Sequence, residues 1–117
     1  MIFEEVKFPG LTDPVKFIVG KSQDENHAIL DHAKPSDYWF HLGNDSSAHV
    51  IGVVPQGIER SKLKYIVKKG AALCKQHTAK VAARPNVAVI YTRVSNIEKC
   101  ATPGEIRMLS EGSIIIC

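Results

Sequence analysis

The feature that most constrains the fold is a stretch in which two β-favouring runs flank a short polar turn. The first run, residues 38–42, reads Tyr-Trp-Phe-His-Leu, and the second, residues 48–54, is mostly apolar. Between them lie Gly43 to Ser47, whose small and polar side chains, Gly43-Asn44-Asp45 above all, are typical of a tight loop. The sequence therefore predicts two neighbouring strands joined by this loop.

Alternation along the first of these strands separates its side chains onto two faces of the sheet. Trp39 and His41 fall on one face, and the other three residues of the run fall on the opposite face. His49 follows the loop, so strand pairing brings it close to His41. Considered singly, Trp39 has the character of a core aromatic, and either histidine that of a structural hydrogen-bonding group. The density of imidazole, indole and hydroxyl groups around one loop points instead to a functional cluster.

Residues in and around this stretch resemble the NFACT-R domain family. Members of that family commonly read D-x-W-F-H, a short spacer, and then G/S-S-H-V. The matching residues here are Asp37-x-Trp39-Phe40-His41 and Ser46-Ser47-x-His49-Val50, with Ala48 inserted as in small stand-alone eukaryotic members. The resemblance continues, in order, through Gly20-Lys21, Glu25-Asn26, Val89–Thr92, Ser95–Lys99 and Pro103-Gly104, so that it covers roughly residues 15–117.

The resemblance implies a non-catalytic RNA-binding module. Similar domains occur in multidomain proteins of ribosome-associated quality control, where they are taken to work with tRNA and the large ribosomal subunit. We therefore expect tRNA or ribosomal RNA as the partner of this chain, without a cofactor. The multidomain proteins also carry N-terminal and coiled-coil regions that this sequence does not show. A protein partner that supplies those regions is accordingly part of the expectation.

Beyond the central stretch, the sequence predicts one α+β domain over residues 1–117. It is expected to hold a largely antiparallel, mixed sheet of about six to seven strands and two helices, the longer packed on one face. Ser22 with Glu25 forms a capping-box pattern that begins the first helix, and Pro35 ends it near Ala33. Further strands are expected at residues 1–8, 15–19 and 87–92, the last of them central in the sheet. Residues 105–109 and 113–117 are expected to form a terminal hairpin around Glu111-Gly112.

The long helix is expected over residues 59–80. Its apolar side chains form one stripe that includes Gly70, which predicts close packing against the sheet. Lys64, Lys68 and Lys75 lie on the roughly opposite face. This arrangement is typical of a solvated helix surface, and we keep it as a secondary basic face. The Thr102-Pro103-Gly104 segment has the composition of a type II turn, so Pro103 and Gly104 are expected to be structural, like Trp39.

Charge is distributed unevenly along the chain. The net charge is +3, but residues 1–56 carry four Lys/Arg against eight Asp/Glu, whereas residues 57–117 carry eleven against four. A basic half is the electrostatic footprint of a polyanionic partner, and RNA contacts also use hydroxyl, amide and imidazole groups. The candidate nucleic-acid contacts are therefore Lys21, Asn26, His41, Ser46, Ser47, His49, Arg93, Asn96 and Lys99. Because the loop is expected to be exposed, we predict that replacing His49 weakens binding and costs little stability.

Other functions remain open at this point. The fold could serve as a DNA-binding module, as a protein-interaction adaptor, or as a metal-dependent nuclease that uses His41, Asp45 and His49. No glycine-rich phosphate loop follows a strand, and the three cysteines contain no C-x-x-C pair that would suggest a zinc site. We therefore predict no catalysis and no metal. The absence of a long apolar window and of a signal-peptide pattern predicts a cytoplasmic protein without membrane contact.

Overall fold

A six-stranded sheet forms the centre of the computed structural model, which describes residues 1–43 and 46–117. The strand order is β1-β2-β4-β3-β5-β8, and each neighbouring pair is antiparallel. This confirms the predicted α+β class with a largely antiparallel sheet. The strands are β1 (Ile2–Val6), β2 (Val15–Gly20), β3 (Tyr38–Leu42), β4 (His49–Gly52), β5 (Ala88–Arg93) and β8 (Ser113–Ile116).

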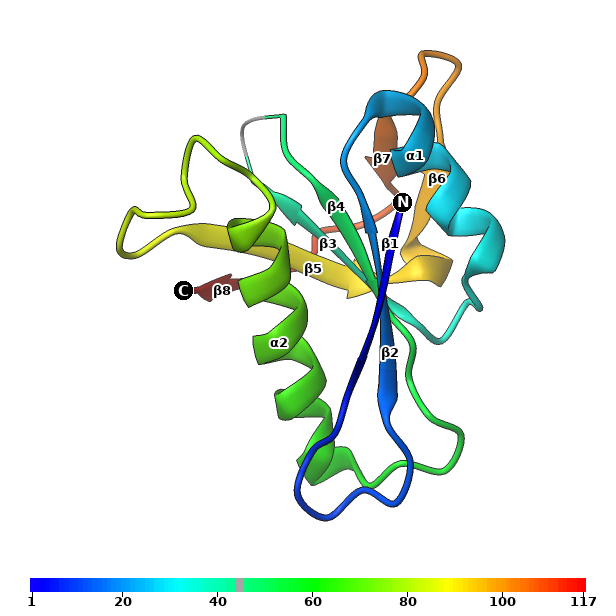
Figure 1. Ribbon diagram of the computed structural model, residues 1–117. Helices are drawn as coiled ribbons and strands as arrows, with labels where there is room; N and C mark the ends of the chain where they lie inside the picture. The colour runs from blue at the N-terminus through cyan, green and yellow to red at the C-terminus, as the bar shows by residue number, and fades with distance from the viewer. Residues whose placement is uncertain (44–45) are drawn as a thin grey trace.

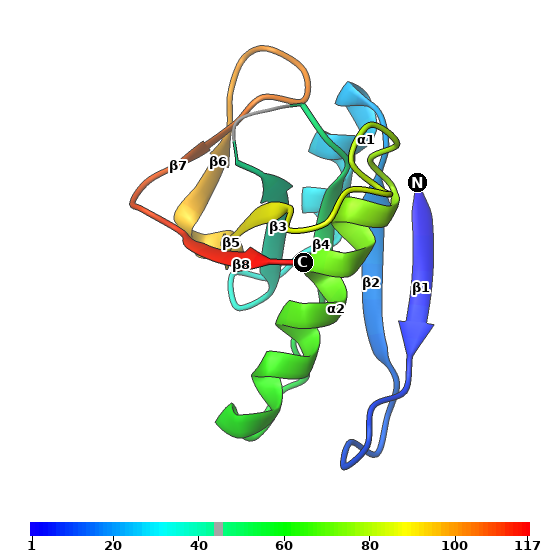
Figure 2. The ribbon, with the colours of Figure 1, turned by 90° about the vertical axis from the view of Figure 1, so that its left-hand side faces the viewer.

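The two faces of the sheet are covered by different elements, as Figures 1 and 2 show. The long helix α2 (Leu63–Gln76) lies against one face, which we call the α2 face. The other face, which we call the α1 face, is covered by α1 (Gln23–Ala28), the 3-10 turn η1 (Ile29–His32) and a second small sheet. That small sheet pairs β6 (Ile97–Lys99) with β7 (Ile106–Met108). Two further 3-10 turns are η2 (Arg60–Lys62) and η3 (Val94–Asn96).

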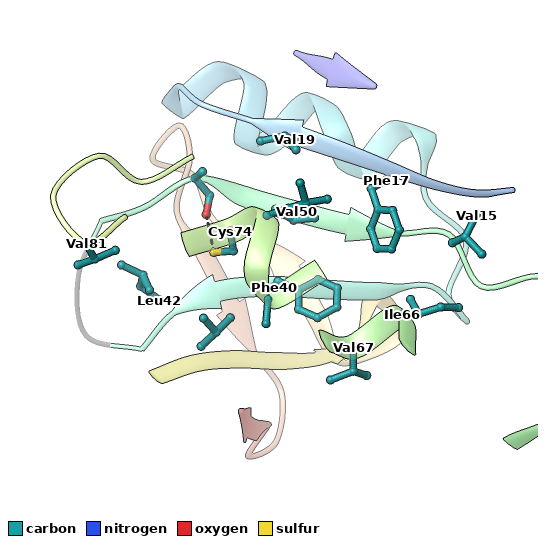
Figure 3. Close-up of a cluster of buried hydrophobic side chains, with 14 residues drawn as sticks. Val15, Phe17, Val19, Phe40, Leu42, Val50, Ile66, Val67, Cys74 and Val81 are labelled. Atoms are coloured by element: carbon teal, nitrogen blue, oxygen red, sulfur yellow. Dashed lines mark hydrogen bonds between the residues drawn. The ribbon is translucent and has the colours of Figure 1, made fainter. Parts of the chain in front are cut away.

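The larger hydrophobic core lies on the α2 face (Figure 3). Phe17, Phe40 and Val50 from the sheet are fully buried there, together with Ile66 of α2. Gly70 of α2 stands directly over Phe40, because a Cβ atom added at Gly70 would lie 2.3 Å from two ring carbons of Phe40. The close packing predicted for Gly70 is therefore present, and it brings the helix backbone onto the sheet.

The smaller core lies on the α1 face and is built around Trp39, Ile18, Ile29, Ile51 and Ile97. Trp39 is only 2% exposed. Because Trp39 and Phe40 alternate along β3, each anchors a different core, as the alternation predicted.

Asp37, the first residue of the central motif, is a buried structural group. Its Oδ1 accepts a hydrogen bond from Val54 N at 2.9 Å, and its Oδ2 accepts one from Lys34 N at 2.8 Å. Its main-chain oxygen accepts from Val94 N at 2.8 Å. A buried carboxylate is tolerated only when such donors satisfy it. Asp37 thus ties the start of β3 to the segments that follow β4 and β5.

The predicted terminal hairpin is wrong. Residues of β7 pair with β6, and β8 pairs separately with the outer edge of β5. Ile106 and Met108 pack against the Trp39 core, whereas Ile115 packs against the Phe40 core. The two strands therefore belong to different sheets and pack on different cores. Because β8 pairs with β5 and forms the edge of the sheet, β5 is the second strand from that edge and does not lie at the centre.

Both helices are shorter than the sequence patterns predicted. α1 ends at Ala28 and continues as the 3-10 turn η1, and α2 ends at Gln76, with 3-10 geometry before it in η2. The capping box at α1 is formed only in part. Ser22 Oγ accepts from Glu25 N at 3.2 Å, but the Glu25 carboxylate accepts from Lys21 N at 3.1 Å and pairs with the N-terminal ammonium.

Candidate functional site

The central motif opens onto a cleft of about 810 Å³ on the α1 face. One wall is formed by the ends of β3 and β4 together with α1, and the facing wall by the connection between β6 and β7. The predicted contact residues that line the cleft are Asn26, His41, Ser46, Ser47 and His49. Trp39, Pro103 and Gly104, which were expected to be structural, line it as well.

Three rings form the base of the cleft. The centroids of His41 and His49 lie 4.8 Å apart with the rings nearly perpendicular. Trp39 stacks on His41 at 5.4 Å with an interplanar angle of 7°, and meets His49 edge to face at the same distance. The strand register explains this cluster, since His41 lies on β3 and His49 on the adjacent β4, with both side chains on the Trp39 face. The proximity of the two histidines that the loop predicted is therefore present.

Asn26 fixes helix α1 to the central motif. Its Oδ1 accepts a hydrogen bond from His49 N at 3.3 Å, and its Nδ2 donates to Ser47 O at 3.4 Å. Gly20 makes room for this contact, because a Cβ atom there would lie 2.8 Å from Asn26 Oδ1. The paired Gly20 and Asn26 of the sequence motif thus have a common structural explanation, and Asn26 shapes the cleft from a buried position.

Ser47 closes the connection between β3 and β4. Its hydroxyl accepts from Leu42 N at 3.1 Å and donates to Ala48 O at 2.8 Å. Ala48 is buried, and its N–H donates to Thr78 Oγ1 at 3.1 Å, beyond the end of α2. Ser47 is therefore a structural residue of the cleft wall as well as a lining residue. Asn44 and Asp45, to which the sequence assigned the turn, lie outside the described residues.

Both histidines of the cleft are neutral at pH 7. Burial, with smaller contributions from His41 and His27, lowers the pKa of His49 to about 3. Burial likewise lowers the pKa of His41 below its usual value. Each neutral imidazole offers one donor and one acceptor nitrogen. Uncharged hydrogen-bonding chemistry therefore dominates the base of the cleft.

Two buried polar atoms of the cluster lack a hydrogen-bond partner within the described part of the chain. They are Nε1 of Trp39 and Nδ1 of His49. Leaving such a buried group unpaired costs about 1–3 kcal/mol. His49 itself is only 4% exposed, which argues for a larger stability cost on its replacement than its position beside the loop suggested. The rings of Trp39 and His41 pack against its side chain, and Asn26 of α1 accepts a hydrogen bond from its N–H.

Four of the predicted contact residues lie outside the cleft lining. Lys21 is exposed just before α1, and Lys99 forms an ion pair with Asp31 at 2.9 Å. The guanidinium of Arg93 lies 4.1 Å from the centroid of the Tyr38 ring and donates to a main-chain carbonyl. Asn96 Nδ2 donates to Thr92 Oγ1 at 3.1 Å and to Ser110 O at 3.0 Å, linking η3 to the segment after β7.

The secondary basic face lies on the opposite side of the sheet. Lys64 and Lys68 are exposed, and Lys75 is partly buried. Lys64 and Lys68 border a shallow groove of about 370 Å³ together with Arg60, which the helical pattern did not single out. Two tyrosines, Tyr38 and Tyr91, line the same groove.

The far wall of the cleft contains the residues that sequence reasoning missed. They are mainly Thr102, Glu105, Ile106 and Met108, joined at the α1 end by Gln23. Gly104 has φ +81°, and a Cβ atom there would lie 2.8 Å from Gln23 Cα, so this turn packs directly on α1. His27 Nε2 also hydrogen-bonds with Glu105 O at 2.9 Å. The turn itself was recognisable from Thr102-Pro103-Gly104, but its partner, far earlier in the chain, was not.

The metal-site alternative can be compared with the geometry only in part, because Asp45 lies outside the described residues. Within residues 1–43 and 46–117, no group of three histidine, cysteine, aspartate or glutamate side chains is placed to hold an ion. The three cysteines are free thiols.

Comparison with known families decides the relationship of this chain. The model of the NFACT protein RNA binding domain matches residues 7–117. The chain belongs to the NFACT-R family. The NFACT-R resemblance seen in the central motif is therefore confirmed, and several of the residues that carry it line the cleft.

The relatives and the solved structures extend this result. Coiled-coil domain-containing protein 25 of Mus musculus is 33% identical over 84 residues, which cover 71% of this chain and 40% of the relative. Its counterpart in Danio rerio is 29% identical over 92 residues, covering 78% and 44%. The NFACT-R chain thus spans less than half the length of these relatives.

Among solved structures, the C-terminal part of the fibronectin/fibrinogen-binding protein from Streptococcus suis has the same fold. It superposes with a TM-score of 0.75 over 87% of this chain and 40% of that chain, at 18% identity. None of the helices in the described NFACT-R residues has the length and apolar character needed to cross a bilayer.

Proposed function

We propose that this NFACT-R chain is a non-catalytic RNA-binding module whose binding site is the cleft beside His41 and His49. The observation that carries the proposal is the match to an RNA-binding domain family over residues 7–117. Part of the motif gathers at one cleft, although these residues are far apart in the sequence: Asn26, Trp39, His41, Ser46, Ser47, His49, Pro103 and Gly104. Neutral imidazoles, amides and hydroxyls at that cleft are suited to ribose and base contacts.

The phosphate contacts in this proposal come from cations outside the cleft. Lys21 stands before α1, and Lys80 Nζ lies 3.4 Å from Ser46 Oγ at the cleft lining. Further contacts are proposed outside the cleft from Arg93 and Lys99, together with the neutral Asn96. The secondary basic face of Lys64, Lys68 and Lys75 adds positive charge on the α2 face. The excess of basic residues after residue 57 supports this distribution of roles.

For the biological setting, we propose tRNA or ribosomal RNA as the ligand, in translation or ribosome-associated quality control in the cytoplasm. We further propose that a protein partner, or regions outside this sequence, supplies the other activities found in multidomain proteins of the family. The chain covers under half of its curated relatives, so the activity of a whole relative is not transferred to it.

The test is a titration of the protein with tRNA, ribosomes and duplex DNA at several salt concentrations, with heparin as a control polyanion. We expect the affinity for RNA to exceed that for heparin, and to fall steeply with salt because bound cations displace counterions from phosphates. Tighter binding of duplex DNA would favour the DNA-binding alternative. Absence of affinity for any nucleic acid at low salt would favour a protein-interaction adaptor.

The absence of catalysis is tested separately. Labelled RNA should remain intact after long incubation with the protein in the presence of Mn²⁺, Mg²⁺ or Zn²⁺. Cleavage that disappears in His49→Gln, with the fold retained, would overturn this part of the proposal and restore the nuclease alternative.

A further inference from the structure

We infer that the cleft accepts one unpaired nucleobase, so that the module selects single-stranded or loop nucleotides over paired duplex. This inference rests on the proposed RNA binding and names the part of the RNA that enters the site. It depends on three features of the cleft: its charge, the shape of its walls and its unpaired polar atoms.

The charge of the lining does not suit a phosphate. None of the described lining residues is lysine or arginine, and the charged side chain among them is the acidic Glu105. Both imidazoles are neutral at pH 7. Hydroxyl and amide side chains can contact phosphate oxygens, but the described lining supplies no cationic side chain to balance the phosphate charge. A neutral group such as a base is therefore the part of a nucleotide that fits inside the cleft.

The walls suit a flat, partly apolar ring. His41, half-buried, lies parallel to the Trp39 indole at the base of the cleft. Pro103, Ile106 and Met108 provide an apolar surface on the facing wall. Unpaired RNA bases are commonly bound by stacking on aromatic or imidazole faces. A base that remains paired in a duplex has both faces covered by its neighbours, and therefore cannot occupy such a space.

The unpaired polar atoms beside the cleft require hydrogen-bonding groups from a ligand or from water. Trp39 Nε1 is a donor only, and neutral His49 Nδ1 donates or accepts according to its tautomer. The edge of each of the four RNA bases presents both acceptors and donors, whereas an apolar ring would satisfy neither atom. The volume of about 810 Å³ lies within the range of about 300–1,000 Å³ usual for small-ligand sites.

The position of Lys80 agrees with a nucleotide whose base lies inside the cleft and whose phosphate lies outside it. Its ammonium lies 3.4 Å from the hydroxyl of Ser46, which lines the cleft and is exposed. A base inserted between His41 and the far wall would leave its own sugar and phosphate at this outer end. Cationic contact with the backbone thus occurs outside the cleft, and base contact inside it.

The experiment compares three RNAs with the wild-type protein at one salt concentration: a short single strand, the same strand with abasic ribose at every position, and the paired duplex. Stacking of one base predicts that the base-containing strand binds about tenfold or more tightly than the abasic strand. Trp39 is the only tryptophan of the chain and lines the cleft. Its fluorescence should therefore change on addition of the base-containing strand and remain unchanged with the abasic strand.

The matched variants separate base contact from phosphate contact. His41→Ala should bring the affinities for the base-containing and abasic strands to within about twofold, because the stacking face is removed. The double variant Lys64→Ala/Lys68→Ala, on the opposite face, should leave their ratio unchanged. The wild-type fluorescence measurement does not depend on the folding of either variant.

Two failures are distinguishable. Equal binding of the base-containing and abasic strands, or full retention of the preference in folded His41→Ala, overturns the inference and leaves RNA binding in place. Absence of binding to all three RNAs overturns the proposed function and the inference with it.

Discussion

The two faces of the sheet differ in how completely they are covered. On the α2 face, one helix of 14 residues spans the strands and seals an apolar core, with Gly70 against Phe40. On the α1 face, the cover is assembled from α1, η1 and the β6–β7 sheet, and these short elements leave a cleft between them. Two of the three unpartnered buried polar side-chain atoms in the described chain, at Trp39 and His49, belong to the residues lining that cleft.

This difference shows that neighbouring residues of one motif can have different roles, one in stability and one in the candidate site. Phe40 and Trp39 are adjacent in β3, yet Phe40 belongs to the sealed core and Trp39 to the base of the cleft. Asp37 of the same motif is a buried structural group. The α2 face should therefore determine stability, and the α1 face should carry binding with a measurable cost in stability.

The largest effect is expected on the α2 face. Phe40→Ala should lower the free energy of unfolding by about 3–5 kcal/mol, because it removes a fully buried ring beneath a helix. Chemical denaturation measures this decrease. The matched control is Phe3→Ala, since Phe3 is 61% exposed on edge strand β1 and its replacement should cost under about 1 kcal/mol. Similar decreases for the two variants would show that the α2 face is not the dominant core.

Gly70→Ala should destabilise the protein by about 1–3 kcal/mol, because the new methyl group would overlap the Phe40 ring. Helix propensity alone predicts the opposite sign, a gain of about 1 kcal/mol. Combining Gly70→Ala with Phe40→Leu should recover part of the stability in a double-mutant cycle. A stabilising effect of the single substitution would contradict the close packing.

The burial of a neutral histidine on the α1 face should make the stability of the protein depend on pH. The pKa of His49 is about 3 in the folded protein, against an ordinary value of 6.5. As the pH falls below 6.5, the unfolded chain takes up a proton that the folded protein does not, so stability is lost between pH 6.5 and about 3. At about pH 5.5 the contribution should be about 1 kcal/mol relative to neutral pH.

The control for the pH effect is His49→Gln, which removes this titration. Its stability should vary less with pH than that of the wild type, with a remaining decrease in the same direction from His41. Denaturation curves at neutral and mildly acidic pH measure both proteins. Parallel pH profiles for the wild type and the variant would show that His49 does not remain neutral in the folded state.

The smallest effect on stability is expected at the outer surface of α2. Lys64→Ala/Lys68→Ala should change the free energy of unfolding by no more than about 0.5 kcal/mol per site, since neither lysine has an ion-pair partner in the described chain. If these lysines bind RNA, the slope of log affinity against log salt should decrease by about 0.7–0.9 for each phosphate that is no longer neutralised. The control is Lys7→Ala/Lys16→Ala, which removes the same charge elsewhere on the exposed surface. Equal slopes for the two double variants would exclude a specific role for this face.

Local sequence patterns were sufficient for the elements on which the cleft is built. Alternation in β3 assigned Trp39 and Phe40 to their correct faces, and the short loop placed His41 next to His49. The helical stripe identified Gly70 as the point of close approach. These features depend on residues close together in the chain, where strand and helix periodicity determine direction.

The burial of His49 depends on tertiary contacts. Its position follows a polar loop, but the rings of Trp39 and His41 and the side chain of Asn26 surround it on the α1 face. The contacts of Arg93, Asn96 and Lys99 within the protein were likewise not visible in the sequence. They lie against the Tyr38 ring, against Thr92 and Ser110, and against Asp31 respectively, and their role in RNA binding stays a prediction.

The sequence by itself determined the α+β class, the NFACT-R motif and the face on which each residue of β3 lies. Only the tertiary structure decided that β6 and β7 pair with each other, that their connecting turn packs on α1, and that a cleft remains between this turn and the histidines. The physical reason is that Ile106, Met108 and Ile115 have the same local strand pattern whichever partner they take. The choice between a terminal hairpin and two separate pairings depends on which apolar surface each strand can bury, and those surfaces, around Trp39 and Phe40, are formed by residues distant in the chain.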